Sequence, residues 1–72
     1  MREIIGENIK KFRKNKKLTQ QNLADILEIS IHAIRKYENN SREPKIEMIY
    51  SIANALDVPV VDILGLTTKT QS

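Results

Sequence analysis

The amino-acid sequence predicts an all-α domain of five short helices. Apolar residues recur at helical spacing through most of the chain, and no useful stretch alternates apolar and polar residues as a half-buried strand would. Clusters of turn formers divide the apolar patterns into short segments. Because the chain has 72 residues, these helices must share one hydrophobic core within one domain.

The first helix is expected over residues 4–15. Ile5, Ile9 and Phe12 recur at i, i+4 and i+7, so they form one apolar stripe with lysines outside it. Basic residues near the C-terminal end of this helix also interact favourably with the partial negative charge of the helix dipole there. Residues 15–17 form a polar connection to the second helix.

The second helix is expected over residues 20–27. The hydroxyl of Thr19 can accept a hydrogen bond from a free N–H group of the first turn, so Thr19 is the expected N-cap. The buried stripe of this helix consists of Leu23, Ala24 and Leu27.

The third helix is expected over residues 31–38, after a turn at residues 28–29 and a capping serine, Ser30. Ile34 and Tyr37 are three residues apart and would seat this helix on the first two. Two helices joined by so short a turn must cross steeply, which leaves the third free to project a polar face. That face carries His32, Arg35 and Lys36.

A fourth helix is expected after the turn formers at residues 39–44. Pro44 prevents continuation of the third helix and fits just before a new one. The fourth helix should end near residue 56. Its predicted apolar stripe consists of Ile46, Ile49, Ala53 and Leu56.

A last short helix is expected after a break at residues 57–59, and Gly65 should stop it. Its apolar residues are Val60, Ile63 and Leu64. Residues 1–66 are therefore expected to form the domain, and residues 67–72 a polar, disordered tail.

The basic residues are concentrated toward the start of the chain. Residues 1–18 contain seven basic and two acidic residues, residues 19–45 contain four of each, and residues 46–72 contain one basic and three acidic residues. This polarisation is expected if one face of the domain contacts a polyanion. A lysine-rich helix that is only solvated explains the charge equally well.

The composition argues against several kinds of site. The chain has no cysteine and one histidine, so disulfides, thiolate metal sites and a protein-only zinc site are not expected. Asp25, Glu28 and Asp62 have no nucleophile, metal set or phosphate loop beside them, so an enzyme is the poorest interpretation. No cofactor or small-molecule ligand is expected. No apolar run is long enough to cross a bilayer, so we expect a cytoplasmic protein without membrane contact.

Three segments together resemble the DNA-binding domain of the Cro and phage-repressor family, the XRE-type helix-turn-helix regulators. They read IKKFRKNKKLTQQNLADIL, ISIHAIRKYENN and EPKIEMIYSIANALDVPVVDIL, and the likeness extends from Ile5 to Leu64. The signal is specific because several pieces combine: LTQ followed two residues later by LA, a capping serine, and an aromatic-Glu pair at residues 37–38. The resemblance implies a compact five-helix, lambda-repressor-like fold with the helix-turn-helix at the second and third helices.

In this family the start of the third helix reads bases, which implies Ile31, His32, Arg35 and Lys36 as base-reading residues. His32 and Lys36 are four apart and share a helix face, so both can reach successive base edges, and Lys36 suits guanine acceptors. Two alternatives stay open. Ile31 can pack inside near Ile34 instead of contacting a thymine methyl group, and Arg35 can bind a phosphate instead of a base.

The resemblance also implies contacts to DNA phosphates, which supply affinity rather than sequence choice. Gln20 would add a donor to a helix N-terminus that already favours an anion, and a solvated glutamine is the alternative. The other expected phosphate-binding residues are Ser30, Asn39, Asn40, Ser41, Arg42, Lys45, Lys10 and Lys14.

Arg13 and Glu38 match a pair that forms a partly buried salt bridge in several members of the family. The implied role is structural, because such a bridge fixes orientation more than it adds stability. Glu28 and Asn40 depart from the family pattern, which often has glycine at both positions. Asn tolerates the left-handed conformation more readily than Glu.

These observations predict a sequence-specific double-stranded DNA-binding transcriptional regulator, in particular a repressor, that inserts its third helix into the major groove. The family usually binds as a homodimer. Val61, Met48 and Leu66 lie outside the apolar stripes and would form a second apolar patch, although scattered surface apolar residues are common. Two other interpretations remain: a protein-interaction or antitoxin-type helix-turn-helix module, and the N-terminal DNA-binding fragment of a longer repressor.

Overall fold

The computed structural model describes residues 2–66, and within that range the chain forms five helices and no strand. The helices are α1 (Arg2–Asn15), α2 (Gln20–Leu27), α3 (Ile31–Glu38), α4 (Ile46–Leu56) and α5 (Val60–Leu64). This confirms the predicted all-α, five-helix fold. α1 begins two residues earlier than expected. The spacing of apolar residues could not indicate this start, because residues 2 and 3 are polar. The expected tail, residues 67–72, lies outside the described residues.

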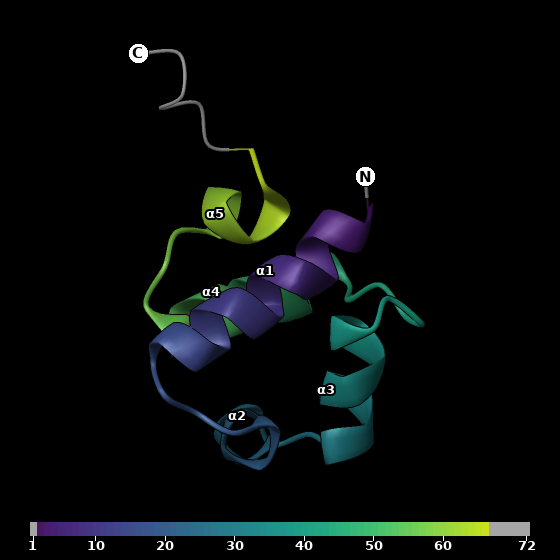
Figure 1. Ribbon diagram of the computed structural model, residues 1–72, viewed down its shortest axis with the longest axis vertical. Helices are drawn as coiled ribbons and strands as arrows, with labels where there is room; N and C mark the ends of the chain where they lie inside the picture. Colours follow the sequence, from purple (N-terminus) through teal and green to yellow (C-terminus); the bar gives the residue numbers. More distant parts are fainter. Residues whose placement is uncertain (1, 67–72) are drawn as a thin grey trace.

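α4 lies behind α1 at the centre of the view in Figure 1, and the two helices are in contact. α5 lies on one side of this pair, and α2 and α3 lie on the other. α1 contacts α3, α4 and α5, while α2 contacts α3 and α4. The two helices of eight residues, α2 and α3, are too short to be stable alone, so their positions depend on this platform.

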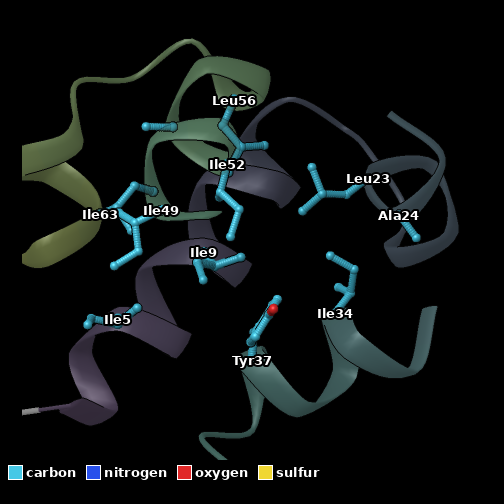
Figure 2. Packing of buried hydrophobic residues seen from close by; sticks show 11 residues of the cluster. Ile5, Ile9, Leu23, Ala24, Ile34, Tyr37, Ile49, Ile52, Leu56 and Ile63 are labelled. Atoms are coloured by element: carbon cyan, nitrogen blue, oxygen red, sulfur yellow. The ribbon is translucent and has the colours of Figure 1, made fainter. Parts of the chain in front are cut away.

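The core draws side chains from all five helices into one cluster (Figure 2). Six of its residues are almost completely buried, and burying each such side chain contributes about 1.5–3 kcal/mol. They are Ile9, Leu23, Ile34, Ile52, Leu56 and Ile63. The helix-turn-helix segment therefore shares its core with the rest of the domain and does not fold as a separate unit.

The predicted apolar stripe of α4 was wrong at its first residue. Ile46 is 51% exposed, whereas Ile52, which was left out of the stripe, is 0% exposed. The buried face runs through residues 49, 52, 53 and 56, which is the i, i+3, i+4, i+7 pattern of one helix side. Ile46 is the first residue of α4, and its side chain lies beyond the edge of this buried face.

Each of the five helices ends in the same type of turn. A residue with positive φ follows the last turn, and the N–H group of the next residue donates to a carbonyl five residues earlier, as in a Schellman motif. The positive-φ residues are Lys17 (62°), Glu28 (60°), Asn40 (66°), Asp57 (60°) and Gly65 (73°). Four of the five are therefore L-residues in a conformation that favours glycine.

The predicted N-caps of α2 and α3 are confirmed. Thr19 Oγ1 accepts a hydrogen bond from the N–H of Asn22 at 2.9 Å, and Ser30 Oγ accepts one from the N–H of Ala33 at 3.2 Å. α2 also has a return bond, from the N–H of Thr19 to Oδ1 of Asn22 at 2.9 Å. This reciprocal capping box holds the start of α2 firmly, with Asn in the place where Glu or Gln is usual.

Candidate nucleic-acid interface

α2 and α3 cross steeply about a three-residue connection. Figure 1 looks almost along the axis of α2, while α3 lies across the view. The turn begins with Glu28 in the left-handed conformation, where the N–H of Ile29 donates to the carbonyl of Ala24 at 3.0 Å. Ser30 then starts α3 in an extended conformation. This geometry places α3 at the edge of the domain (Figure 1).

α3 has one buried side and one exposed side. Ile34 and Tyr37 point into the core, as Figure 2 shows. His32, Arg35 and Lys36 are all exposed. Ile31 is half-buried: part of its side chain packs against the core and part remains exposed to solvent. The expected base-reading residues therefore lie on α3 as one half-buried apolar position and three exposed polar positions.

The segment after α3 carries most of the expected phosphate-binding residues. Asn39, Asn40, Ser41 and Arg42 are exposed, and Oδ1 of Asn39 accepts a hydrogen bond from the N–H of Ser41 at 2.9 Å. Lys45 is exposed at the N-cap position of α4, where its side chain makes no capping hydrogen bond. These residues extend from the C-terminal end of α3 to the start of α4.

Lys10 and Lys14 are both exposed on α1. Gly6 and Arg13 face α3. Lys10 lies four residues after Gly6 and three residues before Arg13, so it borders the same side of α1. Lys14 lies further round the helix, away from the core. Lys17, which was not among the expected DNA-binding residues, is also an exposed cation and lies two residues before the N-cap of α2.

Arg13 and Glu38 form a buried ion pair between α1 and α3. Arg13 is 6% exposed and Glu38 is 9% exposed. Nε of Arg13 lies 2.6 Å from Oε2 of Glu38, and Nη2 lies 3.1 Å from Oε1. Nη1 of Arg13 also donates to the carbonyl of Leu18 at 2.7 Å. Every buried side-chain polar atom among the described residues has a hydrogen-bond partner, so this pair is fully satisfied.

Gln20 has a partner that sequence reasoning did not anticipate. Its Nε2 donates to Oε1 of Glu38 at 3.0 Å, and the side chain is half-buried. The first residue of α2 is therefore bonded to the last residue of α3 as well as being an expected phosphate donor.

Gly6 is a second residue whose role only the structure shows. A Cβ atom at this position would lie 2.5 Å from the backbone oxygen of Tyr37 and 2.5 Å from Oδ1 of Asn40. α1 can approach the C-terminal end of α3 this closely because residue 6 has no side chain. A glycine inside a helical pattern was the signal for close packing.

Of the three apolar residues expected in a second patch, Val61 and Leu66 are exposed and Met48 is half-buried. Met48 lines an open hollow of about 450 Å³ with Tyr37, Arg42, Glu43, Lys45 and Glu47. Val61 lies in α5 and Leu66 lies two residues after its end, and neither residue lines that hollow. Within residues 2–66, none of the helices has both the length and the apolar character of a membrane span, and no cluster of three metal-ligating side chains is found.

Comparison with known proteins agrees with this geometry. The profile of a helix-turn-helix domain matches residues 6–68. The chain belongs to the helix-turn-helix family of the Cro and phage-repressor type. It is similar in fold to the crystal structure of the clp gene regulator ClgR from C. glutamicum, with a TM-score of 0.83, 27% identity, and coverage of 99% of this chain and 92% of that chain.

The chain matches only part of each of two longer relatives. The chain is 53% identical over 55 residues to the uncharacterized HTH-type transcriptional regulator YqaE of Bacillus subtilis, covering 76% of this chain and 47% of the relative. It is 40% identical over 62 residues to the antitoxin PezA of Streptococcus pneumoniae, covering 86% of this chain and 39% of the relative. The chain thus spans half or less of the length of these two members of the family.

Proposed function

We propose that this protein is a sequence-specific double-stranded DNA-binding transcriptional regulator, and in particular a repressor. One observation carries the proposal: Ile34 and Tyr37 seat α3 on the core, while the polar side chains of α3 are exposed on its other side. The major groove is about 12 Å wide and admits a helix presented in this way. Occupying the DNA with such a domain would exclude other proteins from the same site.

Base reading is assigned to Ile31, His32, Arg35 and Lys36. His32 and Lys36 share one face of α3, and an ammonium group suits the O6 and N7 acceptors of guanine. The exposed part of Ile31 suits a thymine methyl group. Arg35 is one residue away from Lys36 on the helix and reaches either a base or the neighbouring phosphate.

Phosphate binding is assigned to groups on either side of α3. The N-terminal end of α2 contributes Gln20, and the start of α3 contributes Ser30. The segment after α3 and the exposed side of α1 contribute Asn39, Asn40, Ser41, Arg42, Lys45, Lys10 and Lys14. Lys10 and Lys14 are two of the seven basic residues in residues 1–18, where the positive charge of the chain is concentrated.

A homodimer on DNA is the proposed assembly, because two copies would read two half-sites about 34 Å apart. Val61 is 45% exposed and Leu66 is 57% exposed, so α5 offers apolar surface to a second copy. Met48 is omitted from this surface because it lines a different part of the domain. Light scattering at micromolar concentration should show a dimer with duplex present; a monomer with and without duplex would reject this assembly.

We infer a role without a catalytic step or a cofactor, in which residues 1–66 act as one DNA-binding unit. The cytoplasm is the proposed place of action, since a regulator of this kind must reach DNA.

The proposal is tested by selecting bound sequences from a pool of random duplexes with the purified chain. One enriched motif is expected, and replacing Lys36 with alanine should relax the preference at one position of that motif. Recovery of an unenriched pool would reject sequence-specific binding.

The similarity to the antitoxin PezA supports a second candidate, a helix-turn-helix module that binds a protein. The length of the relatives likewise supports an N-terminal DNA-binding part of a longer repressor. Nuclear magnetic resonance separates the first two functions. Adding duplex should shift the backbone resonances of residues 30–36 if the chain binds DNA, whereas a protein-binding module has no need of that surface.

A further inference from the structure

A single hydrogen bond, from Gln20 to Glu38, links the Arg13–Glu38 ion pair to the N-terminal end of α2, where phosphate binding is proposed. Gln20 is the first residue of α2, and its Nε2 donates to Oε1 of Glu38 at 3.0 Å. The same carboxylate accepts hydrogen bonds from Arg13 at 2.6 and 3.1 Å. One acidic side chain therefore joins α1, the start of α2 and the end of α3.

An ionised carboxylate distinguishes between the two ends of the Gln20 amide. It accepts hydrogen bonds and donates none, so Nε2 must face Glu38, and the amide oxygen would meet a negative charge there. Nε2 carries two hydrogens, and only one hydrogen bond from it is made to the described residues. The second N–H is therefore available to an acceptor outside the domain.

Arg13 makes it possible to place a carboxylate near a DNA phosphate. An unpaired carboxylate beside the N-terminal end of α2 would repel the phosphate that this end attracts. The guanidinium group neutralises Glu38 at close range and is itself held by the carbonyl of Leu18 at 2.7 Å. The side chains of Arg13, Glu38 and Gln20 thus form a cluster without net charge, in which one N–H group of the Gln20 amide is available to a phosphate.

We propose that Glu38 is a positioning residue for phosphate binding, which holds the Gln20 amide in a donating orientation before DNA arrives. The inference rests on the proposed function and names a residue that acts through Gln20. A glutamine without this partner samples several rotamers and both amide orientations, and it loses that freedom on binding. Glu38 removes part of this cost in the free protein.

The neighbouring glutamine provides a matched control. Gln21 is also in the first turn of α2, but its Nε2 donates to Oδ1 of Asp25 at 2.8 Å within the same helix. It has no bond to the ion pair and no assigned DNA contact. Replacing Gln21 with methionine therefore removes a glutamine from the first turn and leaves the cluster intact.

The test measures affinity for a random-sequence duplex of about 20 base pairs, because phosphate contacts are independent of sequence. Gln20→Met is compared in the wild-type chain and in the Arg13→Met/Glu38→Met background, where the whole ion pair is replaced by apolar side chains of similar volume. We expect Gln20→Met to weaken binding about fivefold in the wild type and less than about twofold in the double-methionine background. Gln21→Met should leave affinity within about twofold of wild type in both backgrounds.

Two results would overturn the inference while leaving DNA binding intact: an equal loss from Gln20→Met in both backgrounds, or no loss in the wild type. If the wild-type chain binds no duplex at all, the proposed function fails and the inference fails with it. The two failures are therefore distinguishable.

A measurement on the unmodified chain covers the case in which the double-methionine variant does not fold. The side-chain amide hydrogens of Gln20 should exchange more slowly with solvent than those of an exposed glutamine, since one is bonded to Glu38. Adding duplex should shift mainly the resonance of the other hydrogen. Rapid exchange of both hydrogens in the free protein, or no shift on adding duplex, would reject the positioning role.

Discussion

Glu28 holds a backbone conformation that a side chain disfavours. Its φ and ψ are 60° and 42°, and the left-handed region costs an L-residue roughly 1–2 kcal/mol. Glycine has no such cost, although it loses more backbone entropy on folding. The turn of the helix-turn-helix therefore keeps its shape at the expense of stability.

Glu28→Gly should raise the free energy of unfolding by about 0.5–1 kcal/mol, measured by urea denaturation. Glu28→Ala is the control, because alanine loses the carboxylate and keeps the left-handed strain. Equal stabilisation by alanine and glycine would show that the carboxylate, and not the backbone, is the source of the effect.

Gly6 is required by the close approach of α1 to the backbone of α3. Gly6→Ala should lower the free energy of unfolding by about 1–3 kcal/mol, because the new methyl group would meet the carbonyl oxygen of Tyr37. This outweighs the roughly 0.5–1 kcal/mol that alanine gains over glycine inside a helix. Glu7→Ala, at an exposed position of the same helix, should change stability by less than about 0.5 kcal/mol. A Gly6→Ala variant as stable as wild type would contradict the predicted clash.

At the scale of helices, α1 and α3 are joined by the Arg13–Glu38 pair. Its two parallel hydrogen bonds fix the rotation of α3 about its own axis, and with it the direction in which Lys36 points. Burial makes this pair more important for orientation than for net stability, because desolvation offsets much of the attraction.

Removing one partner of this pair should cost more than removing both. Arg13→Met leaves a buried carboxylate without its cation and should destabilise the chain by about 3–5 kcal/mol. Arg13→Met/Glu38→Met removes both charges and should be nearer to wild type. Thermal denaturation of the two variants measures the difference, and a double variant less stable than Arg13→Met would contradict it.

At the scale of the whole molecule, the proposed phosphate contacts include four cations, Lys10, Lys14, Arg42 and Lys45. They come from α1, the segment after α3 and the start of α4, so the electrostatic surface depends on the assembled fold. Counterion release relates their number to the salt dependence of binding, with a slope of about −0.9 for each neutralised phosphate.

The logarithm of affinity should therefore fall with the logarithm of salt concentration at a slope of about −4 for one domain and about −7 for a dimer. Arg42→Ala should reduce the slope by about 1 per domain and weaken all sequences alike, whereas Lys36→Ala should alter sequence preference. Fluorescence anisotropy over a salt series measures both. A flat salt response would reject phosphate binding by these residues.

Local features of the chain were predictable because each depends on residues close together in sequence. Thr19 and Ser30 cap helices through atoms three residues away, and Ile34 and Tyr37 define the buried side of α3 by their spacing. The exposure of His32 and Lys36 follows from the same helical period, while their contacts to DNA remain a prediction. Helical spacing was less informative at the start of α4, where Ile46 fits the apolar pattern but its side chain is exposed.

The sequence by itself determined the number and order of the helices, the N-caps Thr19 and Ser30 and the polar side of α3, because short-range hydrogen bonds and helical spacing decide these features. Only the tertiary structure decided that Gln20 meets Glu38, 18 residues away, and that Gly6 meets the end of α3. Such contacts depend on how helices cross and rotate, which is set by the shape of the shared core. The site is therefore a product of packing, although its residue types are visible in the sequence.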